Sequence, residues 1–327
     1  MSEAYEPVSI LAPHIAGFVS EKRALGYDYH SEELILLRFD RYCLERSLDT
    51  ESVTRDFLSG WMERSDTEGL FNQGKRISAV RQLLIYMASL GIQVYIPHDF
   101  CHLEKKLPHI LAQKELDAFF FEIDAYVPRQ VSNRNLLRLS NEYKILFRMI
   151  YGCGLRNSEG AGIAVSDVDM EAGILTIRNA KGQKDRLVYM SDDLRELCKK
   201  YFQYLCDESG MVLEWFFPAL DPARPLKNTT VDRRFALAWA KTGYAASCND
   251  KPVVHDLRFT FVTKRINRWI EEGKDIKVML PYLARFLGHK SISETHYYYH
   301  LTLDAARIIK SRDSIGPTVI PEVVSYE

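Results

Sequence analysis

Apolar residues recur at the spacing of an α-helix through residues 10–90, and this periodicity constrains the fold more than any other feature of the chain. The apolar positions include Phe18 and Leu25 early in this region, then Leu34 and Phe39. Helices this short bury their apolar stripes against one another, so this region is predicted to be a small helical bundle. Its amphipathic helices are predicted at residues 10–26, 31–46, 54–64 and 72–90.

The segment 97–108 interrupts the periodicity and ends in Glu104-Lys105-Lys106-Leu107-Pro108, which indicates a linker between two domains. Helical periodicity resumes beyond it, at residues 112–123 and 134–151. Alternating segments at 174–178 and 186–190 predict two strands of a hairpin.

The predicted fold class is therefore mainly α with a small antiparallel β-sheet, an α+β fold. The turn Lys181-Gly182-Gln183 places Lys181 near the tip of the hairpin. The expected divisions are a helical domain at 1–107, a second domain at 108–312 and an irregular C-terminal tail at 313–327.

The composition is that of a globular protein, with 46% hydrophobic and 27% charged residues. The chain has no apolar run near the roughly 18 residues that cross a membrane, so no membrane association is expected. Six cysteines are scattered without a Cys-x-x-Cys pair, which favours reduced thiols and a cytoplasmic location.

The net charge of −1 weighs against nucleic-acid binding, because such proteins usually carry excess positive charge on at least one face. Residues 1–108 hold 12 Lys and Arg against 16 Asp and Glu, while the remainder holds 31 against 28. A positive groove is compatible with acidic outer faces, since the local field matters more than the sum. The low charge therefore predicts weaker nonspecific affinity and does not exclude DNA.

Three motifs in the last third of the chain combine residues that bind and attack phosphate: His255-Asp256-Leu257-Arg258, Leu287-Gly288-His289 and Tyr297-Tyr298-Tyr299-His300. A further arginine lies upstream in Gly154-Leu155-Arg156-Asn157-Ser158-Glu159. Guanidinium groups bind phosphate oxygens in bidentate fashion, and a tyrosine hydroxyl can hold phosphorus covalently. Such a set can break and rejoin a phosphodiester without a metal or nucleotide, so no cofactor is expected.

These motifs resemble the boxes of the tyrosine recombinase (phage integrase) family, over roughly residues 10 to 310. The family has an arginine in a Gly-Leu-Arg-x-Ser-Glu box, a His-x-x-Arg box and a Leu-Gly-His box, matched at Arg156, Arg258 and His289. Its nucleophile lies nine residues after the last histidine and precedes x-His, which points to Tyr298 and His300.

The family's lysine pattern, Gly-Lys-Gly-x-Lys-x-Arg, is matched by residues 180–186, with Ala180 in place of the first glycine. Two departures concern the subfamily. Phe259 stands where the family usually has histidine, and the stretch from Arg258 to His289 is longer than in the simplest members. In this it resembles recombinases carried by transposons and integrated elements.

The resemblance implies a C-shaped, two-domain DNA clamp, with a SAM-like helical core-binding domain and an integrase catalytic domain. It implies that two arginines and two histidines neutralise charge on the scissile phosphate, namely Arg156, Arg258, His255 and His289. Tyr298 then forms a 3′-phosphotyrosine bond and releases a 5′-hydroxyl. That oxygen leaves poorly unless protonated, and the match to the family assigns the proton to Lys181.

Several assignments have an alternative in the residues themselves. Lys184 competes with Lys181, and Tyr297 and Tyr299 compete with Tyr298. His289 either binds phosphate or packs structurally. Glu159 either holds Arg156 in place or caps the helix that begins there, and His300 is assigned a supporting place behind Tyr298.

The chain offers further candidate residues for DNA and metal binding. His98, Cys101 and His102 lie together, but no second cluster with metal-ligand spacing accompanies them, so no metal site is expected. The complete phosphate-binding motif, Gly-x-x-x-x-Gly-Lys followed by Ser or Thr, is absent from the sequence. The candidates for contacts with DNA phosphates are Lys75, Arg76, Arg81, Arg134, Arg138, Arg233 and Arg234.

The sequence thus predicts a site-specific DNA recombinase, acting in integration or excision, of a mobile element. The expected partners are double-stranded DNA with inverted-repeat core sites, three further copies in a tetramer on two duplexes, and a second recombinase or a DNA-bending factor. The expected location is cytoplasmic, at the nucleoid. The alternatives are cleavage of a single duplex, as by a type IB topoisomerase, and a non-catalytic DNA-binding accessory protein.

Overall fold

The computed structural model describes residues 6–98, 107–130, 132–178, 185–209, 213–248, 251–289, 291 and 293–295. The chain divides into two compact units, Met1–Lys106 and Leu107–Glu327. The division falls within the segment where helical periodicity stops. The described residues are mostly helical with a small antiparallel sheet, which confirms the predicted α+β class. Among them, no helix is both long and apolar enough to cross a membrane.

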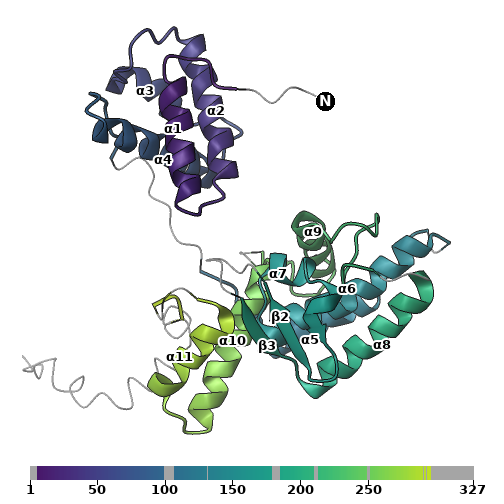
Figure 1. Ribbon diagram of the computed structural model, residues 1–327. Coiled ribbons are helices and arrows are strands. Elements are labelled where there is room, and N and C mark those ends of the chain that lie inside the picture. The colour runs from purple at the N-terminus through teal and green to yellow at the C-terminus, as the bar shows by residue number, and fades with distance from the viewer. Residues whose placement is uncertain are drawn as a thin grey trace, which may run out of the picture. The chain divides into compact units, whose positions relative to one another are not determined.

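The first unit packs its helices around one apolar core that includes Phe18, Phe39 and Leu83. Two predicted core positions are wrong. Leu25 is 64% exposed because it follows the last turn of its helix, and Leu34 is exposed because the buried face of the next helix begins at Ile35. The helices of this unit are α1 (Ala12–Ala24), α2 (His30–Glu45), α3 (Arg55–Met62) and α4 (Leu70–Ser89) (Figure 1).

The second unit contains the three-stranded sheet, in the order β1-β2-β3, with both pairs antiparallel. The predicted hairpin is β2 and β3, and Ile177 pairs with Arg186 at its open end. The two-residue strand β1 was not predicted, because it is too short to show alternation. The strands are β1 (Val168–Asp169), β2 (Ile174–Ile177) and β3 (Arg186–Tyr189), preceded by the 3-10 helix η1 (Val165–Asp167).

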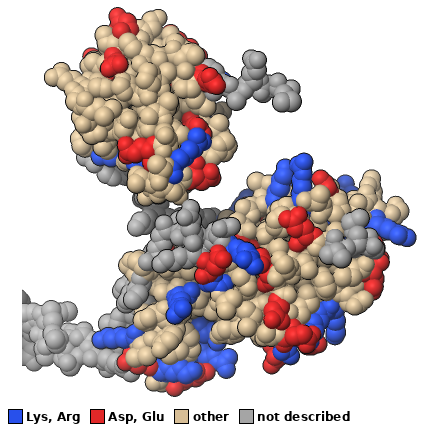
Figure 2. All heavy atoms as spheres, in the orientation of Figure 1, with Lys and Arg blue, Asp and Glu red and all other residues tan. Residues whose placement is uncertain are grey.

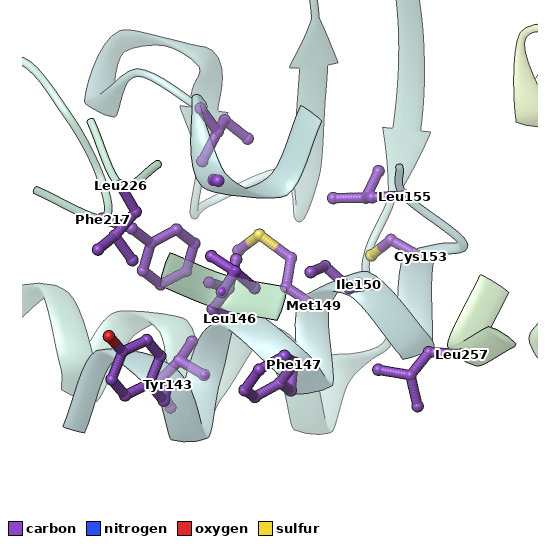
Figure 3. Close-up of a cluster of buried hydrophobic side chains, with 14 of the residues drawn as sticks. Tyr143, Leu146, Phe147, Met149, Ile150, Cys153, Leu155, Phe217, Leu226 and Leu257 are labelled. Atoms are coloured by element: carbon purple, nitrogen blue, oxygen red, sulfur yellow. The ribbon is translucent and has the colours of Figure 1, made fainter. Parts of the chain in front are cut away.

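Helix α6 runs through the core of the second unit and is buried along most of its length. Figure 3 shows the side chains that it contributes to the core, among them Tyr143, Leu146, Phe147 and Ile150. A rigid α6 fixes the position of the loop that follows it. The helices of the unit are α5 (Gln113–Asp124), α6 (Arg134–Cys153), α7 (Asn157–Ala161), α8 (Asp192–Ser209), α9 (Asn228–Trp239), α10 (Val254–Glu271) and α11 (Ile276–Leu287).

Helices α10 and α11 form a second, smaller core with Phe261, Ile266, Leu283 and Leu287 among its buried members. The start of α10 is capped by Asp256, whose Oδ2 accepts the Val253 N–H at 2.9 Å. The end of α11 lies close to the start of α10, because Arg258 Nη2 donates to the carbonyl of Leu287 at 2.8 Å. This arrangement brings the His-x-x-Arg and Leu-Gly-His motifs together.

Candidate active site

Arg156 stands at the N-cap of α7, three residues beyond the end of α6. The turn between the two helices depends on Gly154, which has a left-handed φ of 60°. A Cβ atom at this position would lie 2.7 Å from a ring carbon of Phe261 in α10. Glycine therefore allows the close approach that places Arg156 beside α10.

Glu159 makes both of the contacts that the sequence left as alternatives. Its Oε2 accepts the Arg156 backbone N–H at 2.8 Å, which caps α7. Its Oε1 accepts from Arg156 Nη1 at 2.7 Å, which fixes the guanidinium. One carboxylate thus holds Arg156 by its backbone and by its side chain.

Arg258 lies in the first turns of α10 and is only 1% exposed. Its Nη1 donates to the carbonyl of Gly154 at 2.7 Å, and its Nη2 donates to the carbonyl of Leu287 at 2.8 Å. Nη1 is also 3.9 Å from Glu159 Oε2. The guanidinium is therefore fixed between the ends of α6 and α11, next to the carboxylate that holds Arg156.

His289 contacts Arg258 through Nε2, 3.0 Å from Nη2. A guanidinium can only donate, so Nε2 accepts, and we assign the ring proton to Nδ1, which lies 2.7 Å from Thr295 Oγ1. Burial, followed by the charges of Arg258 and Arg156, lowers the pKa of His289 to about 3. The imidazole is thus neutral at pH 7.

His255 precedes Arg258 by one helical turn, and its ring meets that of Phe259 edge-on at a centroid distance of 5.0 Å. Desolvation and the charges of Arg258 and Arg156 lower the pKa of His255 to about 4, against the opposing charge of Glu159. Because the His255 side chain is exposed, we attribute its lowered pKa more to the charges of Arg258 and Arg156 than to desolvation. His255 too is neutral at pH 7.

Arg186 is a member of this cluster to which the sequence assigned no role. Its Nη1 and Nη2 donate to Glu159 Oε1 and Oε2 at 2.9 and 2.7 Å, and its Nε donates to the carbonyl of Phe286 at 2.9 Å. The available signal was strand alternation, because Arg186 shares the buried face of β3 with Val188. An arginine at a core-facing position requires a partner.

Glu159 is consequently shared by several arginines. Burial alone would raise the pKa of its carboxyl, but the hydrogen bonds and charges of Arg186 and Arg156 lower that pKa to about 2. The carboxylate is ionised throughout the physiological range. The cluster of Arg156, Arg186, Arg258 and Glu159 therefore carries a net charge of about +2, which suits it to an anion such as phosphate.

A model of the phage integrase family matches residues 127–304 of this chain, which is more than half of its length. The chain belongs to the phage integrase family. This confirms the resemblance based on the sequence boxes. The matched residues include all of the box positions quoted above.

Named relatives agree with this membership. The protein y4rB of Sinorhizobium fredii is 25% identical, over 86% of this chain and 90% of its own. Tyrosine recombinase XerC of Chlorobaculum tepidum is 28% identical, over 63% of this chain and 60% of its own. The transposon Tn1549 integrase, solved in complex with transposon right end DNA, has a TM-score of 0.62 at 19% identity, over 91% of this chain and 98% of the integrase. That last likeness shows that the fold is the integrase fold.

Three predicted residues of this integrase-family site lie outside the described residues: Lys181, Tyr298 and His300. The competing residues Lys184, Tyr297 and Tyr299 lie outside them as well. Their assignments stay predictions. Among the described residues, no three His, Cys, Asp or Glu side chains are grouped so that they could hold a metal ion.

The prediction that Arg138 contacts DNA is wrong, because its side chain is buried in the second unit. It pairs with the buried Glu142 and donates to the carbonyls of Pro218 and Ala219 at 2.9 and 2.6 Å. Arg234 is also engaged internally, with its guanidinium carbon 3.5 Å from the ring centroid of Tyr126.

In the first unit, Arg76 and Arg81 likewise serve the unit's own structure. Arg76 pairs with Glu68 at 2.6 Å and donates to the carbonyls of Trp61 and Glu63. Arg81 donates to the carbonyl of Pro97 at 2.9 Å. These contacts hold loops on α4, so neither guanidinium points freely to solvent.

The remaining candidates Lys75, Arg134 and Arg233 have exposed side chains. Lys75 lies 3.7 Å from Glu32, an interaction that solvent weakens. On the visible face of the second unit in Figure 2, basic and acidic side chains are interspersed. The three exposed residues therefore remain the DNA-binding candidates that the structure leaves accessible.

Proposed function

We propose that this protein is a site-specific DNA recombinase that cleaves and rejoins DNA through a 3′-phosphotyrosine intermediate, in the integration or excision of a mobile element. The observation that supports this best is the convergence of Arg156, Arg258 and His289 from three separate segments. The guanidinium groups of Arg156 and Arg258 are fixed before any substrate arrives, and His289 holds Arg258 by accepting from it. Preorganised donors of this kind stabilise charge that develops in a transition state.

In the proposed reaction, Arg156 and Arg258 bind the non-bridging oxygens of the scissile phosphate, with His255 and His289 beside them. The hydroxyl of Tyr298 attacks phosphorus, and the bond to the 5′-oxygen breaks as Lys181 gives that oxygen a proton. A 5′-hydroxyl from the partner duplex then attacks the phosphotyrosine and releases the tyrosine. Each bond broken is replaced by an equivalent one, so strand exchange needs no external energy source.

We further propose that residues 1–107 act as the core-binding domain and residues 108–312 as the catalytic domain. Lys75, Arg134 and Arg233 are proposed to contact DNA phosphates. The proposed assembly is a tetramer on two duplexes with inverted-repeat core sites. Support comes from family membership and from relatives solved with DNA, such as XerH bound to palindromic difH substrate, which has a TM-score of 0.60 at 19% identity over 90% of this chain and 82% of XerH.

A nicked suicide substrate tests this function. It carries the core site found by mapping cleavage in DNA that flanks the gene, and it loses the 5′-hydroxyl fragment after cleavage, so the covalent adduct accumulates. We expect the adduct with the wild type and its absence with Tyr298→Phe, which keeps the ring and removes only the nucleophilic oxygen. An adduct that persists in the variant, mapped to Tyr297 or Tyr299 by mass spectrometry, would overturn the assignment of Tyr298.

The same preparation separates the alternatives. A wild type that binds the site and never forms an adduct is an accessory protein. One that relaxes supercoiled DNA and never exchanges strands between paired sites is a topoisomerase. We expect strand exchange, and we expect it to be unaffected by EDTA.

A further inference from the structure

Arg186 connects two parts of the site that are far apart in sequence. Through both terminal nitrogens it binds Glu159, the carboxylate that fixes Arg156. Through Nε it binds the carbonyl of Phe286, at the end of α11. Its guanidinium also lies against Gly288, where a Cβ atom would be 2.9 Å from Nη1. It therefore contacts the supports of Arg156 and the backbone next to His289.

The charges show what this connection does. Glu159 faces Arg156, Arg186 and, at longer range, Arg258. If Arg186 were absent, the whole carboxylate charge would act on Arg156 and Arg258, which are the proposed phosphate ligands. A guanidinium that is fully neutralised by a carboxylate binds phosphate less strongly. Arg186 thus leaves positive charge available for the substrate.

We propose that Arg186 is a positioning residue for DNA cleavage, which balances the charge of Glu159 so that Arg156 and Arg258 remain available to the scissile phosphate. The inference rests on the proposed function. Arg186 does not itself touch the reacting atoms. It acts through Glu159 on Arg156, and through the end of α11 on the backbone beside His289.

The test measures single-turnover cleavage of the suicide substrate by three variants. Arg186→Gln removes one positive charge, so we expect cleavage to slow by about a hundredfold or more, the scale seen when one charge-stabilising group is lost. Arg186→Lys keeps the charge without the bidentate geometry, so its rate should lie between those of the wild type and Arg186→Gln.

The double variant Arg186→Gln, Glu159→Gln is the decisive measurement. It removes one charge of each sign, which restores the net charge that the phosphate meets. We expect it to cleave at least about tenfold faster than Arg186→Gln alone. If Arg186 only supported the fold, removing its partner as well would leave the rate unchanged or lower it.

Arg178 provides a matched control. It also pairs with a carboxylate, Asp167, at 2.6 Å, but it is 58% exposed and does not contact the cluster. Arg178→Gln should cleave at close to the wild-type rate. Circular dichroism and DNA binding show whether each variant is folded. If Arg186→Gln does not fold, the cleavage rate of Arg186→Lys is compared with that of the wild type instead.

Three results would overturn the proposal: wild-type cleavage by Arg186→Gln, a double variant no faster than Arg186→Gln, or an Arg186→Lys rate no higher than that of Arg186→Gln. The proposed function fails in a different way, because then the wild type itself forms no adduct. The two failures are therefore distinguishable in one set of reactions.

Discussion

At the scale of single residues, the charged side chains of the site contact other protein groups more than they contact solvent. Arg258 uses two backbone carbonyls and His289, and Glu159 is shared among arginines. Each group has its protonation state set by its neighbours, so the histidines stay neutral while the carboxylate stays charged. The cluster is ready for an anion before one binds.

This arrangement predicts a pH dependence of stability. His289 has a pKa of about 3 in the folded chain, below its ordinary value of 6.5, so between these values the unfolded chain binds a proton that the folded chain does not. Its contribution to stability is complete above about pH 6.5 and is lost as the pH falls toward 3. The unfolding free energy of His289→Gln should therefore fall less steeply than that of the wild type between pH 7 and pH 5. The difference in slope should be part of the about 1.4 kcal/mol per pH unit that corresponds to one bound proton.

Urea unfolding at the two pH values measures this effect. Glu159, whose pKa is lowered from 4.5 to about 2, acts mainly below this range, whereas His255, with a pKa of about 4, contributes to the slope that remains. An unchanged slope in His289→Gln would show that the histidine is not held neutral.

At the scale of elements, the ends of helices position the chemistry. Helices α6 and α11 both stop at a glycine with positive φ, and each stop places a carbonyl on Arg258: that of Gly154 in one case and that of Leu287 in the other. At Gly288 a side chain would be strained by the φ of 67° and would also meet Arg186.

We expect Gly288→Ala to lower both stability and cleavage. The left-handed backbone costs an alanine about 1–2 kcal/mol, and the contact with Arg186 adds to this. Thermal unfolding and suicide-substrate cleavage measure the two effects. Gly243→Ala is the control, because nothing lies within 4 Å of a Cβ atom there and both readouts should stay near wild type.

The sequence was sufficient for most elements, since long amphipathic helices and a hairpin leave periodic patterns. It was insufficient where a tertiary contact decides the outcome. The sequence named Arg138 as a DNA contact and assigned no role to Arg186, whereas the structure buries Arg138 and places Arg186 in the cluster with Arg156. Arg138 binds carbonyls from a loop 80 residues away, and Arg186 binds a carboxylate 27 residues away. Local pattern does not encode such distant partners.

At the scale of the whole molecule, the two units have separate apolar cores. Each core contains at least one buried cysteine, whose reactivity can be used to follow the unfolding of that unit. Burial raises the pKa of Cys43 in the first unit and of Cys198 in the second to about 12, and it raises the pKa of Cys153 further. Cys206 is exposed. Only thiolates react readily with alkylating reagents.

We therefore expect iodoacetamide to label Cys206 in the native protein and to leave the three buried thiols unmodified. Labelling pulses across a urea series, read by mass spectrometry, should show Cys153 and Cys198 becoming reactive together and Cys43 following the transition of its own unit. Coincident exposure of all three would show that the units unfold as one. Native labelling of Cys198 at the rate of Cys206 would contradict its burial.

The bidentate ion pair between Arg186 and Glu159 also bears on how this protein can evolve. If Arg186 acts as proposed, losing either partner alone unbalances a buried charge cluster, so either single substitution gives a less active protein. A lineage then leaves this arrangement most readily when both positions change together. The two residues are then inherited together. Each is the last residue of a different sequence box, Glu159 of the first arginine box and Arg186 of the lysine pattern.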